Sequence, residues 1–138
     1  MSFQVLEHPA DLRVRLEGEG VEELLCSGAQ ALSLFFVGDV EVSPKKSKTL
    51  SGSYLDHEEL LVSVLNDLIF EASASALVLP HLVHIQLQDG GYEIRAQGDR
   101  VDGKNLVWAG EVKAATYGGL EVLRLPSGRL RADVIFDC

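Results

Sequence analysis

Three short segments of the chain carry side chains that could do chemistry together. The segment Glu-His-Pro-Ala-Asp near the N-terminus places His8 and Asp11 close in sequence, between two apolar runs. Lys113 lies within a run of small and apolar residues, Val-Lys-Ala-Ala-Thr-Tyr. At the end of the sequence, Asp137 precedes Cys138 and its main-chain carboxylate. Carboxylate oxygens are the ligands that hard cations such as Mg²⁺, Ca²⁺ and Mn²⁺ prefer.

The last strand-like run is apolar up to its penultimate residue, so we expect it to be held in a sheet rather than frayed. That would bring the Asp137 carboxylate close to the main-chain carboxylate of Cys138. Like charges that share a site raise one of the two pKa values unless a cation lies between them. If Asp11 also came near, three carboxylates would converge, with His8 or Lys113 at the rim.

Each of these residues also has a structural interpretation. Asp11, after Pro-Ala, is typical of a turn, and His8 is typical of a hydrogen-bonded strand end. Lys113 fits a solvated strand face, and Asp137 fits a chain end in water. The sequence contains no Ser-His-Asp or Cys-His nucleophile pattern, phosphate-binding loop or dinucleotide fingerprint. The residues alone therefore predict one candidate hard-cation site in a small domain.

Composition limits the class of protein. The chain has 138 residues, of which 46% are hydrophobic, and this predicts a single domain over residues 1–138. With only two cysteines, and neither a signal peptide nor a membrane-spanning run, we predict a soluble, cytoplasmic protein. The net charge of −9, from 21 acidic and 12 basic residues, argues against direct binding of nucleic acid, and the lack of a long apolar run argues against a membrane role. It suits a protein that docks on a basic partner.

Hydrophobic periodicity predicts an α+β fold, with two amphipathic helices packed on an antiparallel or mixed sheet. Both helices carry apolar residues at helical spacing, the first with Gly38 as its C-cap and the second with Asp56 as its N-cap. The expected helices span residues 21–38 and 56–75; the expected strands and hairpins span residues 3–8, 11–20, 82–98, 104–117 and 120–138, and residues 40–56 are expected to form a loop or an edge strand.

In order along the chain, four of these segments resemble the archease family. Residues 7–36 are similar to its opening, in which a His-x-Ala-Asp motif leads into a strand and a helix rich in leucine and alanine. Residues 58–72, with Leu-Asn-Asp-Leu, resemble its second helix. The segment VKAATYGGLEV (residues 112–122) resembles its most recognisable motif, and LRADVIFDC (residues 130–138) resembles its closing strand.

The resemblance implies a non-enzymatic helper of the GTP-dependent RNA-splicing ligase, in tRNA splicing and RNA repair. Such proteins promote formation of the ligase–guanylate intermediate and allow repeated turnover, using a metal-binding acidic site. By position, Asp11 and Asp137 match the metal-coordinating aspartates, and the Cys138 carboxylate is a further candidate ligand for Ca²⁺, Mg²⁺ or Mn²⁺. Lys113 matches a lysine needed for activation, and His8 is a second candidate for that role. Gly118 stands where many members have a histidine.

Two other functions fit the same residues. A small Mg²⁺- or Mn²⁺-dependent phosphoester hydrolase could use Asp11, Asp137 and Lys113 around a metal-bound water. A general chaperone-like interaction module would need no metal. Phosphatase assays on the purified protein and calorimetry with divalent cations would separate these two functions from ligase activation.

Overall fold

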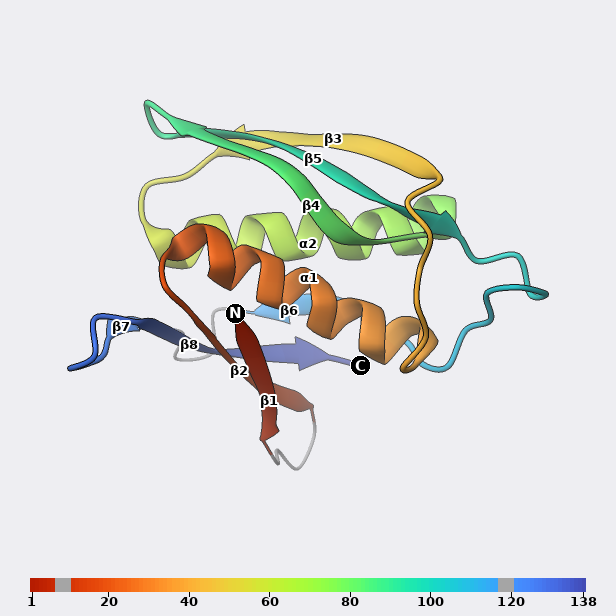
Figure 1. Ribbon diagram of the computed structural model, residues 1–138, viewed down its shortest axis with the longest axis horizontal. Helices are drawn as coiled ribbons and strands as arrows, with labels where there is room; N and C mark the ends of the chain where they lie inside the picture. Colours follow the sequence, from red (N-terminus) through yellow and green to blue (C-terminus); the bar gives the residue numbers. More distant parts are fainter. Residues whose placement is uncertain (7–10, 117–120) are drawn as a thin grey trace.

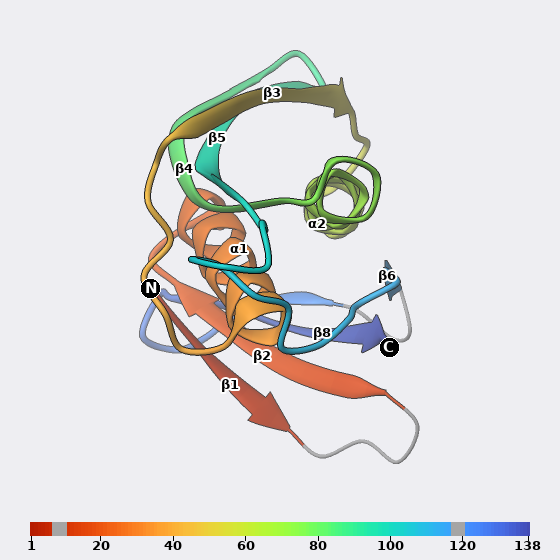
Figure 2. The same cartoon turned by 90° about the vertical axis from the view of Figure 1, so that its right-hand side faces the viewer.

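The fold is described from a computed structural model, which covers residues 1–6, 11–116 and 121–138. Over these residues the strands form two antiparallel sheets, and both helices lie between them (Figures 1 and 2). The predicted α+β class is confirmed, with the strands divided between two sheets. The elements are β1 (Ser2–Leu6), β2 (Leu12–Gly18), α1 (Val21–Val37), β3 (Lys46–Ser53), α2 (His57–Ser75), β4 (Leu77–Gln88), β5 (Gly91–Arg100), β6 (Ala114–Thr116), β7 (Val122–Arg124) and β8 (Leu130–Asp137).

The five-stranded sheet has the order β1-β2-β8-β6, and β7 pairs with another part of β8. Alternation along its two central strands decides which residues enter the core. Val14 and Leu16 of β2 are buried, as are Val134 and Phe136 of β8. The predicted alternating strand that contains Val14 and Leu16 is therefore confirmed, and so is the hairpin that ends the chain.

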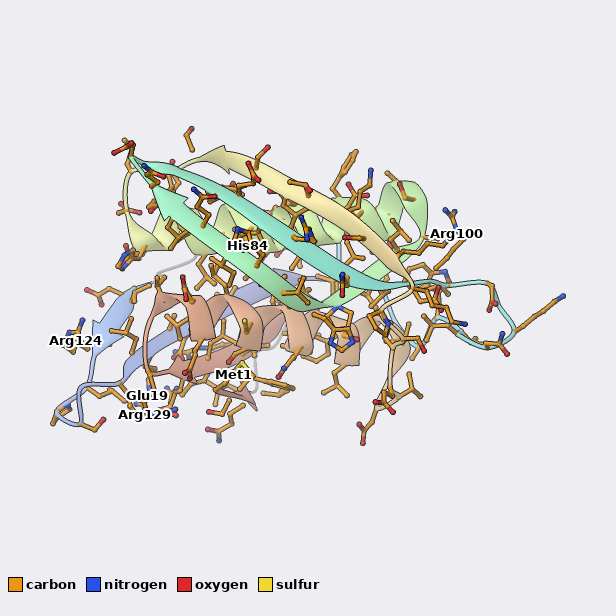
Figure 3. All side chains as sticks on the ribbon, turned by 45° about the horizontal axis from the view of Figure 1, so that its top comes forward. Met1, Glu19, His84, Arg100, Arg124 and Arg129 are labelled. Atoms are coloured by element: carbon orange, nitrogen blue, oxygen red, sulfur yellow. The ribbon has the colours of Figure 1, made fainter. Side chains whose placement is uncertain are left out.

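The outer face of this sheet carries cross-strand ion pairs between β2 and β8. Arg15 lies opposite Asp133 and donates to it through two guanidinium nitrogens, at 2.9 and 3.1 Å. Glu17 lies opposite Arg131, with a nitrogen–oxygen distance of 3.0 Å. The ladder therefore alternates charges of opposite sign, which stabilises directly opposed residues. Arg129 and Glu19 form a further pair beyond the end of β2 (Figure 3).

The second sheet has three strands in the order β3-β5-β4, and the helices separate it from the first (Figure 2). The strands β4 and β5 form the predicted hairpin, turned at Asp89 and Gly90, whose φ angles are both positive (53° and 73°). Positive φ at both central residues is the conformation of the tight turns that join antiparallel strands, and it favours Asp-Gly. Of the two interpretations offered for residues 40–56, the edge strand is confirmed by β3.

Helix α1 begins at Val21 and ends at the predicted C-cap, Gly38. It contacts β2 of one sheet and β4 of the other, so its side chains are buried in both directions. Gly28 allows a close approach to α2, because a Cβ atom there would lie 2.7 Å from Leu65 Cδ2. A glycine in mid-helix weakens the helix, and here it permits this tight crossing.

Helix α2 begins at His57, and the Asp56 side chain accepts a hydrogen bond of 2.8 Å from the Glu59 N–H, as an N-cap should. Neither helix in the described part of the chain is long and apolar enough to cross a membrane.

The strand predicted for residues 104–117 is wrong for most of its length. Residues 101–113 contain no strand, and of the described residues of this segment, up to Thr116, only Ala114–Thr116 pair with β8 as a strand. Asp102 and its neighbours form a side-chain-capped turn instead, with hydrogen bonds of 2.8–3.1 Å to three backbone N–H groups.

Candidate functional site

The ends of β2 and β8 place the two predicted metal-binding aspartates side by side. The antiparallel register pairs Leu12 with Phe136, so its extension by one residue pairs Asp11 with Asp137. Both are half-buried. Residues that alternate along a strand share a face, so this rung lies on the same outer face as the ion pair between Arg15 and Asp133. Between the two lies the rung of Arg13 and Ile135, and Arg13 turns its guanidinium group to Asp133 at 2.9 Å.

The pKa of the Cys138 thiol shows which acidic side chains lie near the end of the chain. Burial raises the pKa of the Cys138 thiol, and a hydrogen bond with the Leu12 backbone opposes this rise. The negative charges of Asp11, Asp137 and Glu111 raise the same pKa further. Three carboxylates therefore act on this one position, and Glu111 is an acidic neighbour that the sequence reasoning missed.

Lys113 reaches this region through its backbone. Its N–H donates to the Asp137 carbonyl oxygen at 2.7 Å, and the next residue, Ala114, is the register partner of Asp137. The side chain of Lys113 is exposed, and no ion pair joins its ammonium group to a carboxylate within the described residues. The structure therefore brings the backbone of Lys113 next to that of Asp137 along the sheet edge. The Lys113 ammonium group and the Asp137 carboxylate form no ion pair within the described residues.

Lys113 also lines a cavity of about 490 Å³ between the C-terminal ends of the helices and the segment that precedes β6. The indole ring of Trp108 packs edge-to-face on Phe36, with ring centroids 5.7 Å apart, and remains 44% exposed. Glu111 lies on the rim with Lys113. A half-exposed tryptophan beside charged groups is typical of a protein–protein contact. Its position could not be predicted, because residues 104–117 were expected to be a regular strand.

Two residues of the predicted site lie outside the described residues. These are His8, a candidate for activation, and Gly118, at the position of the family's frequent histidine. Among the residues that the structure does describe, no group of three or more His, Cys, Asp or Glu side chains is arranged to hold a metal ion. The predicted metal site at Asp11, Asp137 and the Cys138 carboxylate therefore stays a prediction.

Comparison with known proteins identifies the family. Residues 3–138 match the archease protein family (MTH1598/TM1083). A protein archease from Pyrococcus furiosus is 33% identical over 134 residues, which cover 95% of this chain and 94% of the relative. A protein archease from Methanosarcina barkeri is 28% identical over 139 residues, covering 98% of this chain and 94% of that relative.

Solved structures support the fold. Protein 1598 of Methanobacterium thermoautotrophicum superposes with a TM-score of 0.77 at 23% identity, covering 99% of this chain and 98% of that one. A Thermotoga maritima protein described as an archease and possible chaperone gives a TM-score of 0.65 at 24% identity, covering 96% and 94% of the two chains. Because the family match spans almost the whole chain, this protein belongs to the archease family.

Proposed function

We propose that this protein is an accessory factor that activates the GTP-dependent RNA-splicing ligase, and that it has no catalytic activity of its own. The observation that carries the proposal is the carboxylate rung at the edge of the five-stranded sheet, where the β2–β8 register aligns Asp11 with Asp137 beside Lys113. Family membership supports the same role, through the ligase activation that the archease resemblance implies.

The carboxylate rung fits a hard divalent cation. Two rungs between β2 and β8, Arg15 with Asp133 and Glu17 with Arg131, pair opposite signs, and Arg13 lies opposite Ile135. The extension of the same register places two carboxylates, Asp11 and Asp137, opposite each other. Asp11, Asp137 and the main-chain carboxylate of Cys138 would supply only oxygen donors, the set preferred by Ca²⁺, Mg²⁺ and Mn²⁺. When bound, such a cation supplies positive charge that can be shared with phosphate or carboxylate oxygens of a partner.

The charge of the protein suits the proposed partner. A ligase that binds GTP and RNA ends needs a basic cleft, and a protein of net charge −9 is attracted to such a surface over a Debye length of roughly 10 Å. Lys113 and Trp108 lie at the same end of the molecule as the carboxylates. In this proposal the carboxylate rung enters the cleft, and Lys113 pairs with a phosphate or a ligase carboxylate.

The test is ligase guanylylation under multiple-turnover conditions, with wild-type protein and the Asp11→Ala, Asp137→Ala and Lys113→Ala variants. Each variant should lower the stimulation at least about tenfold, as expected when a buried or charge-assisted contact of a complex is removed. Glu93→Ala, on the exposed surface of β5, and Lys104→Ala, in the 101–113 segment, are matched controls and should stimulate like wild type. Undiminished stimulation by all three site variants would refute the proposal.

Calorimetry with Ca²⁺, Mg²⁺ and Mn²⁺ tests the cation separately. We expect wild-type protein to bind at least one of these ions and Asp11→Asn to bind it more weakly. Ligase stimulation without cation binding would retain the accessory role and remove the metal from it. Release of phosphate from a generic ester by the purified protein alone would favour the metal-dependent hydrolase instead.

A further inference from the structure

The short strand β6 receives a second partner from a side chain. Within the described residues, β8 is the only strand that pairs with β6, so the backbone groups of Ala115 that point away from β8 need other partners. The Asn66 side chain of α2 supplies both of them. Its Oδ1 accepts from the Ala115 N–H at 2.8 Å, and its Nδ2 donates to the Ala115 carbonyl at 3.0 Å. The amide therefore takes the place of a neighbouring strand.

This double contact requires an amide. Asparagine has one acceptor and two donors on a short side chain, whereas a carboxylate can only accept and an alanine can do neither. Both asparagine and aspartate have the same size and shape. The contact is half-buried, where an unpaired backbone group is costly.

The same helix face holds the next strand as well. The Glu58 Oε1 atom accepts from the Val122 N–H of β7 at 2.9 Å. Glu58 and Asn66 lie about two helical turns apart on α2, at the 3.6 residues per turn of an α-helix. Helix α2 thus fixes both β6 and β7, the strands on either side of residues 117–120.

The contact to Ala115 bears directly on the candidate site. Ala115 lies two residues after Lys113, and between them Ala114 is in register with Asp137. Before β6, residues 101–113 form no strand, so the alignment of Lys113 with Asp137 depends on its own N–H bond to the Asp137 carbonyl and on the strand residues that follow. A shift of β6 along or away from β8 would move Lys113 relative to the carboxylate rung.

From this geometry we infer that Asn66 is a positioning residue, which sets the place of Lys113 beside Asp137 by holding the free edge of β6. The inference rests on the proposed function and assigns a role to a residue that touches neither the cation nor the partner. Glu58 supports it through β7.

The first experiment measures the tether without the ligase. Hydrogen exchange of the Ala115 amide, followed by NMR in the full-length protein, should accelerate about tenfold or more in Asn66→Ala, because a protecting hydrogen bond is lost. Asn66→Asp keeps the acceptor and should accelerate it less. The amide of Val134 in β8 and the same measurements on Asn105→Ala, an exposed asparagine, should stay unchanged. An unchanged Ala115 exchange rate in Asn66→Ala would overturn the inference.

The second experiment measures ligase guanylylation against activator concentration. We expect Asn66→Ala to lower the plateau of stimulation about as much as Lys113→Ala does, with little change in the half-saturating concentration. Glu58→Gln, which keeps an acceptor, should behave like wild type, whereas Glu58→Ala should lose part of the plateau. If Asn66→Ala fails to fold, the isosteric Asn66→Asp decides the point by an intermediate plateau.

Outcomes of the two experiments separate the inference from the proposed function. A wild-type plateau for Asn66→Ala, together with faster Ala115 exchange, would overturn the positioning role while ligase activation stands. A wild-type protein that does not stimulate the ligase would refute the proposed function and the positioning role with it, and the exchange data would then describe a structural tether only.

Discussion

The two helices occupy the same layer and are held in different ways. Helix α1 lies between the sheets (Figure 2). Its contacts with β2 and β4 are made mostly by apolar side chains, with one hydrogen bond of 3.3 Å from the buried Ser27 hydroxyl to the Glu17 carbonyl of β2. Helix α2 lies beside it at the open side of the layer (Figure 2). Besides its buried apolar residues, it has a polar face formed by Ser63, Asn66 and Asp67. From that face Asn66 forms hydrogen bonds with β6 of the five-stranded sheet, while Ser63 and Asp67 form hydrogen bonds with Tyr92 of β5 in the other sheet.

The two helices therefore contribute differently: α1 contributes mainly to the stability of the fold, and the polar side chains of α2 determine the position of neighbouring strands. Apolar burial is nondirectional and scales with area, so α1 contributes mainly stability, and Ser27 supplies its one side-chain hydrogen bond to a strand among the described residues. Hydrogen bonds are directional, so the side chains of α2 determine which backbone group lies where. We therefore expect substitutions on α1 to act mainly on folding, and substitutions on the polar face of α2 to act more on local geometry.

The largest effect is expected from Leu24→Ala in α1, whose side chain is fully buried. Truncation removes apolar contacts and leaves a cavity, which lowers the free energy of unfolding by about 3 kcal/mol. Chemical denaturation followed by circular dichroism measures it. The control is Phe70→Ala in α2, where the ring is 63% exposed and the loss should stay within about 0.5 kcal/mol. Equal losses at both positions would mean that burial of the side chain does not set the cost of truncating it in this layer.

A smaller effect is expected from Tyr92→Phe. The hydroxyl of Tyr92 donates to Asp67 Oδ2 at 2.5 Å and lies 2.8 Å from the Ser63 hydroxyl. Burial and the bond to Asp67 raise the pKa of Tyr92 to about 12, so the hydroxyl stays protonated at neutral pH. Its removal should cost about 1–2 kcal/mol of unfolding free energy.

The matched control for that substitution is Tyr54→Phe. Tyr54 is half-buried, and its side-chain hydroxyl makes no hydrogen bond within the described residues. Its removal should leave the free energy of unfolding almost unchanged. If Tyr54→Phe were as destabilising as Tyr92→Phe, the loss would reflect burial of the ring edge rather than the polar contacts of α2.

The comparison also explains how far the sequence could predict the fold. The apolar spacing in α1 and the capping of α2 at Asp56 are local signals, and both helices follow them. Periodicity cannot tell whether a helix is covered on one side or on two, so the second sheet was not anticipated. Asn66 has no local signature, because a polar residue on a helix is usually solvated.

The candidate site was predicted by residue and not by arrangement. The sequence names Asp11 and Asp137 as candidates without fixing their approach, and the register whose extension aligns them follows from pairing between strands more than 100 residues apart. Such pairing depends on the whole sheet and leaves no trace in local sequence. Glu111 was missed for a related reason, since its neighbours resemble a regular strand but are irregular up to Lys113.

The smallest effect is expected in the pH dependence of Asp67→Asn. Burial raises the pKa of Asp67, the bond from Tyr92 opposes this, and the charge of Glu71 raises it again. Because the folded pKa lies above the unfolded value of about 3.9, the stability linked to this group is complete below that pH and declines as pH rises through the folded pKa. The amide variant has no such decline.

The unfolding free energy of Asp67→Asn, relative to that of the wild type, should therefore increase between acidic and neutral pH. The increase should be less than about 1 kcal/mol, since solvent screens a half-buried group. Denaturation at several pH values measures the difference, with Asp89→Asn at the exposed hairpin turn as the control. If the difference in unfolding free energy between variant and wild type did not change with pH, Asp67 would ionise in the folded protein as readily as in the unfolded chain. Ionisation of the polar face of α2 would then not destabilise the fold.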